Sequence, residues 1–250
     1  MNPAVTIVEI LGRSEQGMTR PFRCRGDDEK LYYVKGNYAG LNSLCCEWVA
    51  GNLAQAMGLP LPEFAIASVP ESLVMASDRS DIRDLGAGLV FASERLEEAR
   101  EITWLEACAS HEEIMASVML FDWWVHNEDR CLSALGGNPN LLMTADGSEH
   151  GKLWMFDFNM AFDPEFSRER FLENHVFAKR FGGWPAGFRE KVDPKMHLAI
   201  NELNDFLASL PSEWLHLEGS EELPSNLDQD MVRSILSRPF LESDAFWNLL

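Results

Sequence analysis

Short apolar runs separated by polar, glycine-bearing turns fill the front of the chain. Runs of this length, bounded by such turns, predict β-strands. The predicted strands are residues 5–11, 20–24, 31–35, 64–69 and 88–91. One helix is predicted among them, from about Ser43 to Met57, because Gly58 and the prolines that follow it end the helical pattern.

After about residue 92 the spacing of apolar residues becomes helical. Apolar side chains recur at helical intervals from Ile114 to Val125, and Ser110 with Glu113 has the spacing of a capping box. A helix is therefore predicted here, with Ser110 as its N-cap, and it leads directly into residues 126–129. Further helices are predicted over residues 168–181, 195–207 and 229–237.

The change of pattern predicts an α+β protein with two lobes and a cleft between them. The strand-rich N-lobe would be residues 1–92 and the helical C-lobe residues 93–250. A chain of 250 residues with 46% hydrophobic content can bury a substantial core. No run of about 18 apolar residues is present, so no membrane span is expected, and the N-terminus does not resemble a signal peptide. Five cysteines without a Cys-x-x-Cys pair argue against a disulfide framework or zinc site and predict a reducing cytoplasm.

The net charge of −19 argues against direct binding of nucleic acid. The charge is unevenly distributed. Residues 1–35 carry six basic and five acidic side chains, a net of +1, whereas residues 201–250 carry two basic and ten acidic ones, a net of −8. The first 35 residues are therefore the electrostatically permissive region for a nucleotide phosphate.

Three polar residues, Asp129, Asn140 and Asp157, stand within apolar sequence in the most informative part of the chain. Strands over residues 140–144 and 152–156, joined by a turn at Asp146-Gly147, predict a hairpin that makes Asn140 and Asp157 neighbours. An amide oxygen beside a carboxylate suits a hard cation, and Mg²⁺ needs few protein ligands when phosphate supplies the others. Asp129 precedes the hairpin and could act as a base. This arrangement is the one that ATP-dependent phosphoryl transfer requires.

The order of Lys35, Glu47, Asp129-Arg130, Asn140 and Asp157 resembles a protein-kinase-like fold. It is most similar to the HipA-like bacterial kinases and more distantly similar to the phosphoinositide lipid kinases. The resemblance covers roughly residues 5–180, and its most specific part is residues 127–162. It implies a bilobal HipA-like fold and a serine/threonine-type kinase, with ATP and Mg²⁺ as cofactors and a protein acceptor.

The resemblance also implies a role for each of these residues. Lys35 would contact the nucleotide phosphates and Glu47 would hold that lysine in place. Asp129 would orient the acceptor hydroxyl and accept its proton, with Arg130 beside it in the catalytic loop. Asn140 and Asp157 would bind Mg²⁺ on the phosphates. The loop from residue 13 to 19 would cover the phosphates, and residues 90–94 would form the hinge that meets adenine. The implied nucleotide-binding residues are Arg13, Ser14, Gly17, Thr19, Lys35, Glu47, Val90 and Phe91.

The catalytic loop departs from the family pattern in its length. Kinase loops place the metal-binding Asn about five residues after the Asp, but eleven positions separate Asp129 from Asn140 here (140 minus 129). Asn138 is therefore a competing ligand. The chain is also shorter than full HipA proteins. These departures motivate one alternative, a pseudokinase that serves as a binding module. A small-molecule or lipid kinase is a further alternative, because the same ligand set serves hydroxyls of several kinds.

Each residue also has an ordinary structural interpretation. Lys35 could protect the edge of a sheet, Glu47 could be a solvated helix charge, and Asp157 could be a buried turn carboxylate paired with Arg130.

In HipA-like systems the kinase often belongs to a toxin–antitoxin pair, so the resemblance also implies a protein partner of the antitoxin kind.

Overall fold

The computed structural model describes residues 3–15, 19–145, 151–216 and 226–250. The predicted turn at Asp146-Gly147 and the candidate loop residue Gly17 lie outside the described residues. The chain contains both helices and strands and divides into two compact units. Unit 1 comprises Met1–Trp48, Pro62–Glu97 and Ser209–Leu227, and unit 2 comprises Val49–Leu61, Glu98–Ala208 and Asp228–Leu250.

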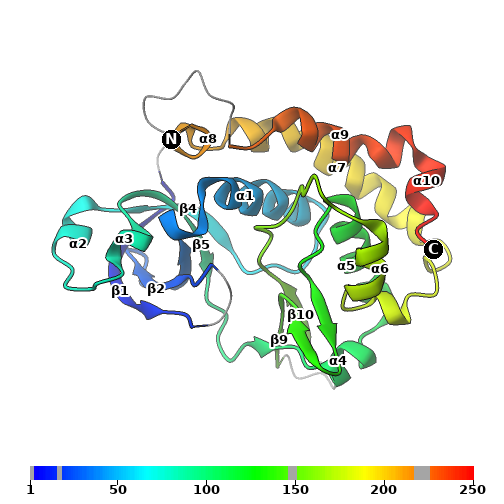
Figure 1. The fold of residues 1–250 in the computed structure, drawn as a ribbon, viewed down its shortest axis with the longest axis horizontal. Coiled ribbons are helices and arrows are strands. Elements are labelled where there is room, and N and C mark those ends of the chain that lie inside the picture. Colours follow the sequence, from blue (N-terminus) through cyan, green and yellow to red (C-terminus); the bar gives the residue numbers. More distant parts are fainter. Residues whose placement is uncertain (1–2, 16–18, 146–150, 217–225) are drawn as a thin grey trace. The chain divides into compact units, whose positions relative to one another are not determined.

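Unit 1 is built on a closed barrel whose strands follow the order β1-β2-β3-β5-β4, drawn in blue to cyan in Figure 1. The bounds are Val5–Arg13 for β1, Phe22–Gly26 for β2, Leu31–Lys35 for β3, Phe64–Val69 for β4 and Gly88–Glu94 for β5. The β1–β4 pair is parallel, with Val5 opposite Ala67, and every other neighbouring pair is antiparallel. All five predicted strands are therefore confirmed.

The barrel is closed around an apolar core to which each strand contributes. The buried residues of this core are Val5, Ile7, Phe22, Cys24, Tyr32, Val34, Ala67, Val69, Leu85, Val90 and Ala92. Closure leaves no edge strand in the barrel, so all five strands gain hydrogen bonds on both sides. The short helices α2 (Glu71–Met75) and α3 (Ile82–Leu85) follow β4, and α3 contributes the buried Leu85.

Helix α1 runs from Leu41 to Ala56, close to the predicted 43–57, after a 3-10 turn at Asn37–Ala39. Most of the helix is buried, including the polar Glu47. A helix apolar on several faces is typical of a buried element. The chain returns to unit 1 at α8 (Ser212–Leu215), where the indole of Trp214 donates to the Leu89 carbonyl at 2.9 Å.

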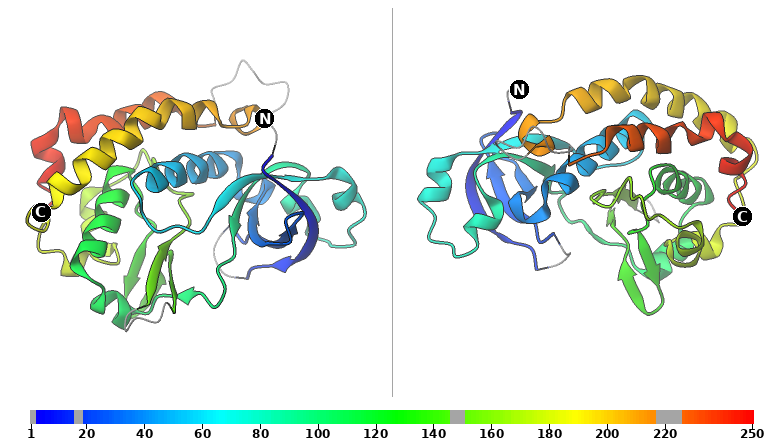
Figure 2. Two further views of the ribbon diagram at one scale, coloured as in Figure 1. Left: turned by 180° about the vertical axis from the view of Figure 1, so that it is seen from behind. Right: turned by 45° about the horizontal axis from the view of Figure 1, so that its top comes forward.

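Unit 2 contains the longer helices. Helix α5 (Glu112–Trp124) is central: nine of its 13 residues are buried. Helix α9 (Gln229–Leu241) packs against it, and the Trp124 indole donates to the Leu236 carbonyl at 2.9 Å. Helices α7 (Phe188–Ala208) and α9 run beside each other in both views of Figure 2. The remaining helices are α4 (Trp104–Ala109), α6 (Arg168–Asn174), η2 (Ala178–Arg180) and α10 (Ser243–Trp247).

Two details of the predicted helices are wrong. The N-cap of α5 is His111, whose ring accepts from the Glu113 amide, whereas Ser110 ends α4; the capping box lies at the start of α4, between Thr103 and Glu106. The predicted helix over residues 168–181 is interrupted at His175, which ends α6 before the 3-10 turn η2. Local sequence gave no reason for a helix to stop at a histidine.

The strands of unit 2 form two small sheets. Strand β9 (Leu141–Thr144) pairs antiparallel with β10 (Lys152–Met155) and with the short β6 (Arg100–Glu101). Strands β7 (Cys131–Ser133) and β8 (Gly136–Asn138) form a second hairpin that the apolar pattern did not predict. Among the described residues, no helix has the length and apolar character needed to cross a bilayer.

Candidate active site

The β9–β10 hairpin brings Asn140 and Asp157 to the same end of one sheet. Leu141 pairs with Met155, and the Phe156 amide donates to the Asn140 carbonyl at 3.2 Å, which confirms the predicted pairing. Asn140 and Asp157 both have left-handed backbone angles, with φ of 46° and 61°. Non-glycine residues held in this region concentrate at functional sites. The backbone therefore leaves the extended conformation of a strand at both residues.

Asp129 lies beside Asn140. It follows the end of α5, where Val125 is the C-cap, and its carboxylate oxygen Oδ2 accepts from two amides. Asn140 Nδ2 lies 2.8 Å from this oxygen and Asn138 Nδ2 lies 2.9 Å from it. Since the amide nitrogen of Asn140 is used on Asp129, the amide oxygen is the atom that can coordinate a metal. The same applies to Asn138, so hydrogen bonding alone does not separate the two candidate ligands.

Burial does distinguish these two asparagines. Asn140 is 1% exposed and starts the strand that pairs with β10, whereas Asn138 is only partly buried at the end of β8. The β7–β8 hairpin accounts for the long spacing between Asp129 and Asn140, because it occupies eight of the intervening residues, Cys131–Asn138. The extra residues form a compact insertion, and Asp129 and Asn140 still meet.

A fully buried polar cluster lies behind these residues. Arg130 is 0% exposed, and its guanidinium donates to Asp122 Oδ2 at 2.7 Å and to the carbonyls of Asn140 and Phe156. The printed sequence suggested Asp157 as a buried partner of Arg130; in the structure Asp157 is only half-buried, and Arg130 forms an ion pair with Asp122. The Arg130 side chain points into the protein. It donates to the backbone of Asn140, a candidate metal ligand, and of Phe156, the residue before the candidate ligand Asp157.

Asp122 is the centre of this cluster and comes from α5. It also accepts from Asn127 Nδ2 at 2.9 Å and lies 3.0 Å from His175 Nε2. Burial raises the pKa of Asp122, but the charge of Arg130 and the contact with His175 outweigh it and leave the pKa below its ordinary value. Burial lowers the pKa of His175 despite its bond to Asp122. The cluster is thus a carboxylate–guanidinium pair with a neutral imidazole.

Unit 1 holds a second buried polar pair. Lys35 ends β3 and is 7% exposed, Glu47 lies on α1 and is 1% exposed, and the two form an ion pair. Lys35 is opposite Phe91 in the β3–β5 ladder, so it does not protect a sheet edge, and Glu47 is not a solvated helix charge. Both of these structural interpretations are wrong. Buried charges of opposite sign require such pairing, because desolvation of an isolated charge is costly.

The candidate phosphate loop is described only at its ends. The Arg13 guanidinium donates to Asp84 at 2.5 Å, lies 3.6 Å from Asp81, and stacks on Phe22 and Tyr38. These contacts direct it toward unit 1 itself. The Ser14 amide donates to the Pro21 carbonyl, Thr19 lies in a turn, and the candidate hinge residues Val90 and Phe91 are buried within β5.

A metal at this site would rely on few protein ligands. Within the described residues, no group of three or more His, Cys, Asp or Glu side chains is arranged to hold a metal ion. An amide oxygen and a carboxylate, from Asn140 and Asp157, match a hard cation that takes its other ligands from phosphate and water. The donor set fits Mg²⁺ with a bound nucleotide and does not fit a structural zinc ion.

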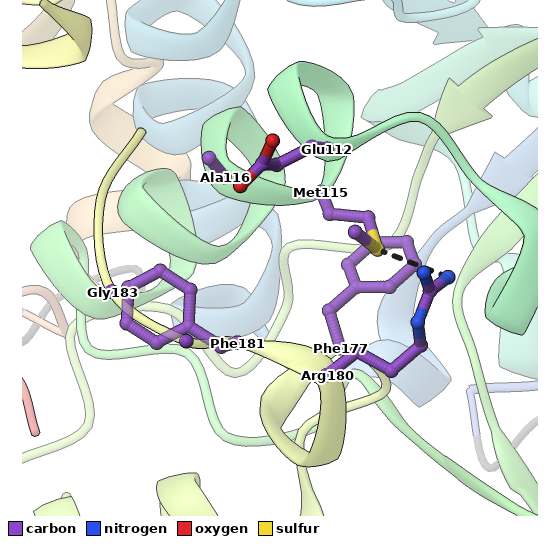
Figure 3. Close-up of a pocket in the computed structure, with 8 residues that line it drawn as sticks. Glu112, Met115, Ala116, Phe177, Arg180, Phe181 and Gly183 are labelled. Atoms are coloured by element: carbon purple, nitrogen blue, oxygen red, sulfur yellow. Dashed lines mark hydrogen bonds between the residues drawn. The ribbon is translucent and has the colours of Figure 1, made fainter. Parts of the chain in front are cut away.

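A small pocket lies elsewhere in unit 2, between the start of α5 and the segment after η2. In Figure 3 Met115 and Phe177 lie next to Arg180, whose Nη1 is 3.8 Å from the Met115 sulfur. None of the candidate catalytic or metal residues lines it. The polar site at the end of β9 is therefore separate from this pocket.

Asp122 and His175 belong to the polar cluster behind the site, and the sequence alone predicted no role for them there. Asp122 had a signal, because it is the single acidic residue in the otherwise apolar half of α5. Asn138 was recognised only as an alternative ligand. His175 had no local signal, because its contact with Asp122 joins positions 53 residues apart.

Comparisons with known proteins identify the family and the fold. A family model described as HipA-like kinase matches residues 7–250. Among solved structures, the crystal structure of the Helicobacter pylori proinflammatory kinase CtkA is similar with a TM-score of 0.60 and 12% sequence identity, covering 98% of this chain and 96% of that chain. The comparison with curated proteins found no match. At this identity the solved structure supports the fold alone.

Proposed function

Because the chain belongs to the HipA-like kinase family, we propose that it transfers the γ-phosphoryl group of ATP to a protein serine or threonine hydroxyl in a Mg²⁺-dependent reaction. The observation that carries this proposal is that Asn140, which bonds Asp129, and Asp157 lie at the same end of the β9–β10 hairpin. Asn140 bonds Asp129 directly at 2.8 Å. A candidate base and two candidate oxygen ligands are thus brought to one end of the hairpin, which supports phosphoryl transfer.

Asp129 is the proposed base, which orients the acceptor hydroxyl and takes its proton. The amides of Asn138 and Asn140 hold one carboxylate oxygen in place. Asn140 and Asp157 would hold Mg²⁺, which when bound neutralises charge on the phosphates. Arg130 positions the backbone of Asn140 and Phe156 from behind and does not contact the reacting groups.

Lys35 and Glu47 are the proposed phosphate-binding pair of unit 1. Glu47 is buried and paired with the lysine, which supports the role of a group that fixes the direction of the ammonium. Arg13 is assigned to the structure of unit 1, since Asp84 and two aromatic rings hold it. A cytoplasmic location and a protein partner of the antitoxin kind remain expectations of the family resemblance.

The first test is thermal unfolding with and without Mg·ATP. A ligand at about 100 times its Kd stabilises by about 2.7 kcal/mol, which for this chain length is a rise in Tm of about 5–10 °C. We expect this rise in wild type only when Mg²⁺ is present, and its loss in Asp157→Asn. The exposed Asp205 gives a matched control, since Asp205→Asn should respond like wild type.

The second test separates binding from transfer. Asp129→Asn should keep the Mg·ATP-dependent rise in Tm but reduce phosphoryl transfer about 100-fold or more, because it removes the base and not the metal ligands. Transfer is measured with radiolabelled ATP and a pool of serine- and threonine-containing peptides. A wild-type protein that binds Mg·ATP and labels nothing would identify a pseudokinase, and no response to nucleotide would refute the proposal.

A further inference from the structure

The β7–β8 hairpin is joined to the candidate base. It is inserted between Asp129 and Asn140, and β7 begins two residues after Asp129. At the other end, Asn138 closes β8 and donates its side-chain amide to Asp129 Oδ2 at 2.9 Å. The hairpin and the candidate base therefore form one connected structure within unit 2.

The tip of this hairpin holds an apolar side chain in water. Leu135 is 100% exposed, the largest exposure of any large hydrophobic residue described. The turn is fixed by its own hydrogen bonds: Ser133 Oγ donates to the Gly136 carbonyl at 3.0 Å and accepts from the Leu135 amide at 3.2 Å. The ordered turn thus presents one leucine to solvent at the tip of the hairpin whose other end, Asn138, bonds the candidate base.

The outer edge of β8 is open to an approaching backbone. The inner strand β7 is paired with β8 and, at Cys131, bridged to His175, whereas β8 pairs with β7 alone among the described residues. Gly136 and Gly137 are exposed and carry no side chains to cover this edge, and residues 131–138 include no charge. Exposed strand edges are usually protected by charge, proline or a covering element.

Gly137 shows that the hairpin needs glycine for its own packing. A Cβ at this position would lie 2.5 Å from the Cys131 carbonyl oxygen, so β8 approaches β7 closely only with glycine here. At Gly136 the space around a Cβ is empty within 4 Å. A side chain at position 136 would therefore meet no neighbour, whereas one at position 137 would collide with β7.

We propose that the β7–β8 hairpin docks an extended segment of the acceptor protein, which pairs with the open edge of β8 and covers Leu135. This inference rests on the proposed kinase function and specifies its substrate class. Repeated backbone N–H and C=O groups are what a strand edge recognises, and small hydroxyl compounds or lipid headgroups do not offer them. Docking at β8 would bring the acceptor hydroxyl next to Asp129, the residue that Asn138 holds.

The experiment measures transfer kinetics with a defined probe. A library of dodecapeptides, each with one serine or threonine, is labelled with Mg·ATP, and the best-labelled peptide becomes the probe. In Leu135→Ser we expect KM for this peptide to rise about tenfold or more, since an apolar contact is lost. The rise in Tm with Mg·ATP should stay at the wild-type value, and Leu135→Ile should keep a KM near that of wild type.

Leu105 provides the matched control. It is 78% exposed on α4 in the same unit, and Leu105→Ser should leave KM unchanged. Hydrogen exchange supplies a readout that does not depend on catalysis. A version of the probe with alanine in place of the phosphorylated residue should slow exchange of the amides at residues 136–138 in wild type.

The inference is overturned if Leu135→Ser keeps the wild-type KM, or if the alanine peptide leaves exchange at residues 136–138 unchanged. Labelling of glycerol or inositol without any labelled peptide would also overturn it. A concentration-dependent dimer that Leu135→Ser abolishes would assign the edge to a second copy of this chain instead. A wild-type protein with neither a Mg·ATP-dependent rise in Tm nor any labelled product refutes the proposed function itself, which is a different result.

Discussion

At the scale of single residues, Asp122 is a fully buried carboxylate whose charge requires partners. Its side chain is fully buried among apolar neighbours on α5 and is stabilised by Arg130, His175 and Asn127. Removing one member of such a buried pair leaves an uncompensated charge, which costs about 3–5 kcal/mol. The site therefore depends on a residue that touches none of the proposed reactants.

We expect Asp122→Ala to lower the free energy of unfolding by about 3–5 kcal/mol. Urea denaturation followed by circular dichroism measures it. Asp122→Asn keeps the shape and part of the hydrogen bonding and should cost less, which retains a folded variant for study. Asp205→Ala, at an exposed position, should change stability by less than about 0.5 kcal/mol. An Asp122→Ala protein as stable as this control would contradict the role of the cluster.

His126 makes stability depend on pH. Its ring stacks on Phe166 with centroids 4.3 Å apart, and burial, aided by the charge of Arg238, lowers its pKa to about 3. The unfolded chain takes up a proton near the ordinary pKa of 6.5, while the folded chain stays neutral down to about pH 3. Stability is therefore fully present above pH 6.5 and decreases as the pH falls through this window.

The expected loss from His126 is about 2 kcal/mol between pH 7 and pH 5. Unfolding free energies measured at both pH values in wild type and in His126→Gln test it. Other groups titrate in this range in both proteins, so the difference between the two slopes is the quantity to compare. Equal slopes would show that His126 does not titrate differently in the folded and unfolded chains.

At the scale of elements, the sequence predicted the helices and strands whose positions depend on nearby residues. The barrel strands, α1 and the β9–β10 pairing follow from apolar runs and turn residues, and their register placed Asn140 opposite Phe156, next to Asp157. The end of α6 at His175 could not be predicted, because the partner of the ring is Asp122 on another helix. The β7–β8 hairpin was missed because its strands have only three residues each and include two glycines.

The hairpin has a specific requirement at Gly137. We expect Gly137→Ala to lower the free energy of unfolding by about 1–3 kcal/mol, because its φ of 156° is unusual for other residues and a methyl group would meet the Cys131 carbonyl. Gly182→Ala is the matched control, since nothing lies within 4 Å of a Cβ there. Urea denaturation of both variants measures the difference. Equal stability would mean that the β7–β8 pairing can shift at no cost.

At the scale of the whole molecule, the dominant property is the charge of −19. Ionised acidic side chains outnumber basic ones 40 to 21, so long-range repulsion opposes the compact state in both units. The ion pairs that could offset it are mostly at the surface, such as Lys191 with Glu113, where each contributes little. The pairs Lys35–Glu47 and Arg130–Asp122 are instead buried.

We expect Tm to rise by a few degrees when NaCl is increased from 10 to 200 mM, because salt screens repulsion between charges further apart than about 10 Å. Differential scanning calorimetry at both salt concentrations measures it. Surface ion pairs would respond in the opposite direction, since salt weakens attraction as well as repulsion, so the sign of the change shows which of the two is larger. A fall in Tm would mean that attraction within the surface ion pairs outweighs repulsion from the net charge. A variant with four exposed acidic residues changed to their amides has a net charge of magnitude 15 in place of 19. In that case this variant should fail to raise Tm at low salt.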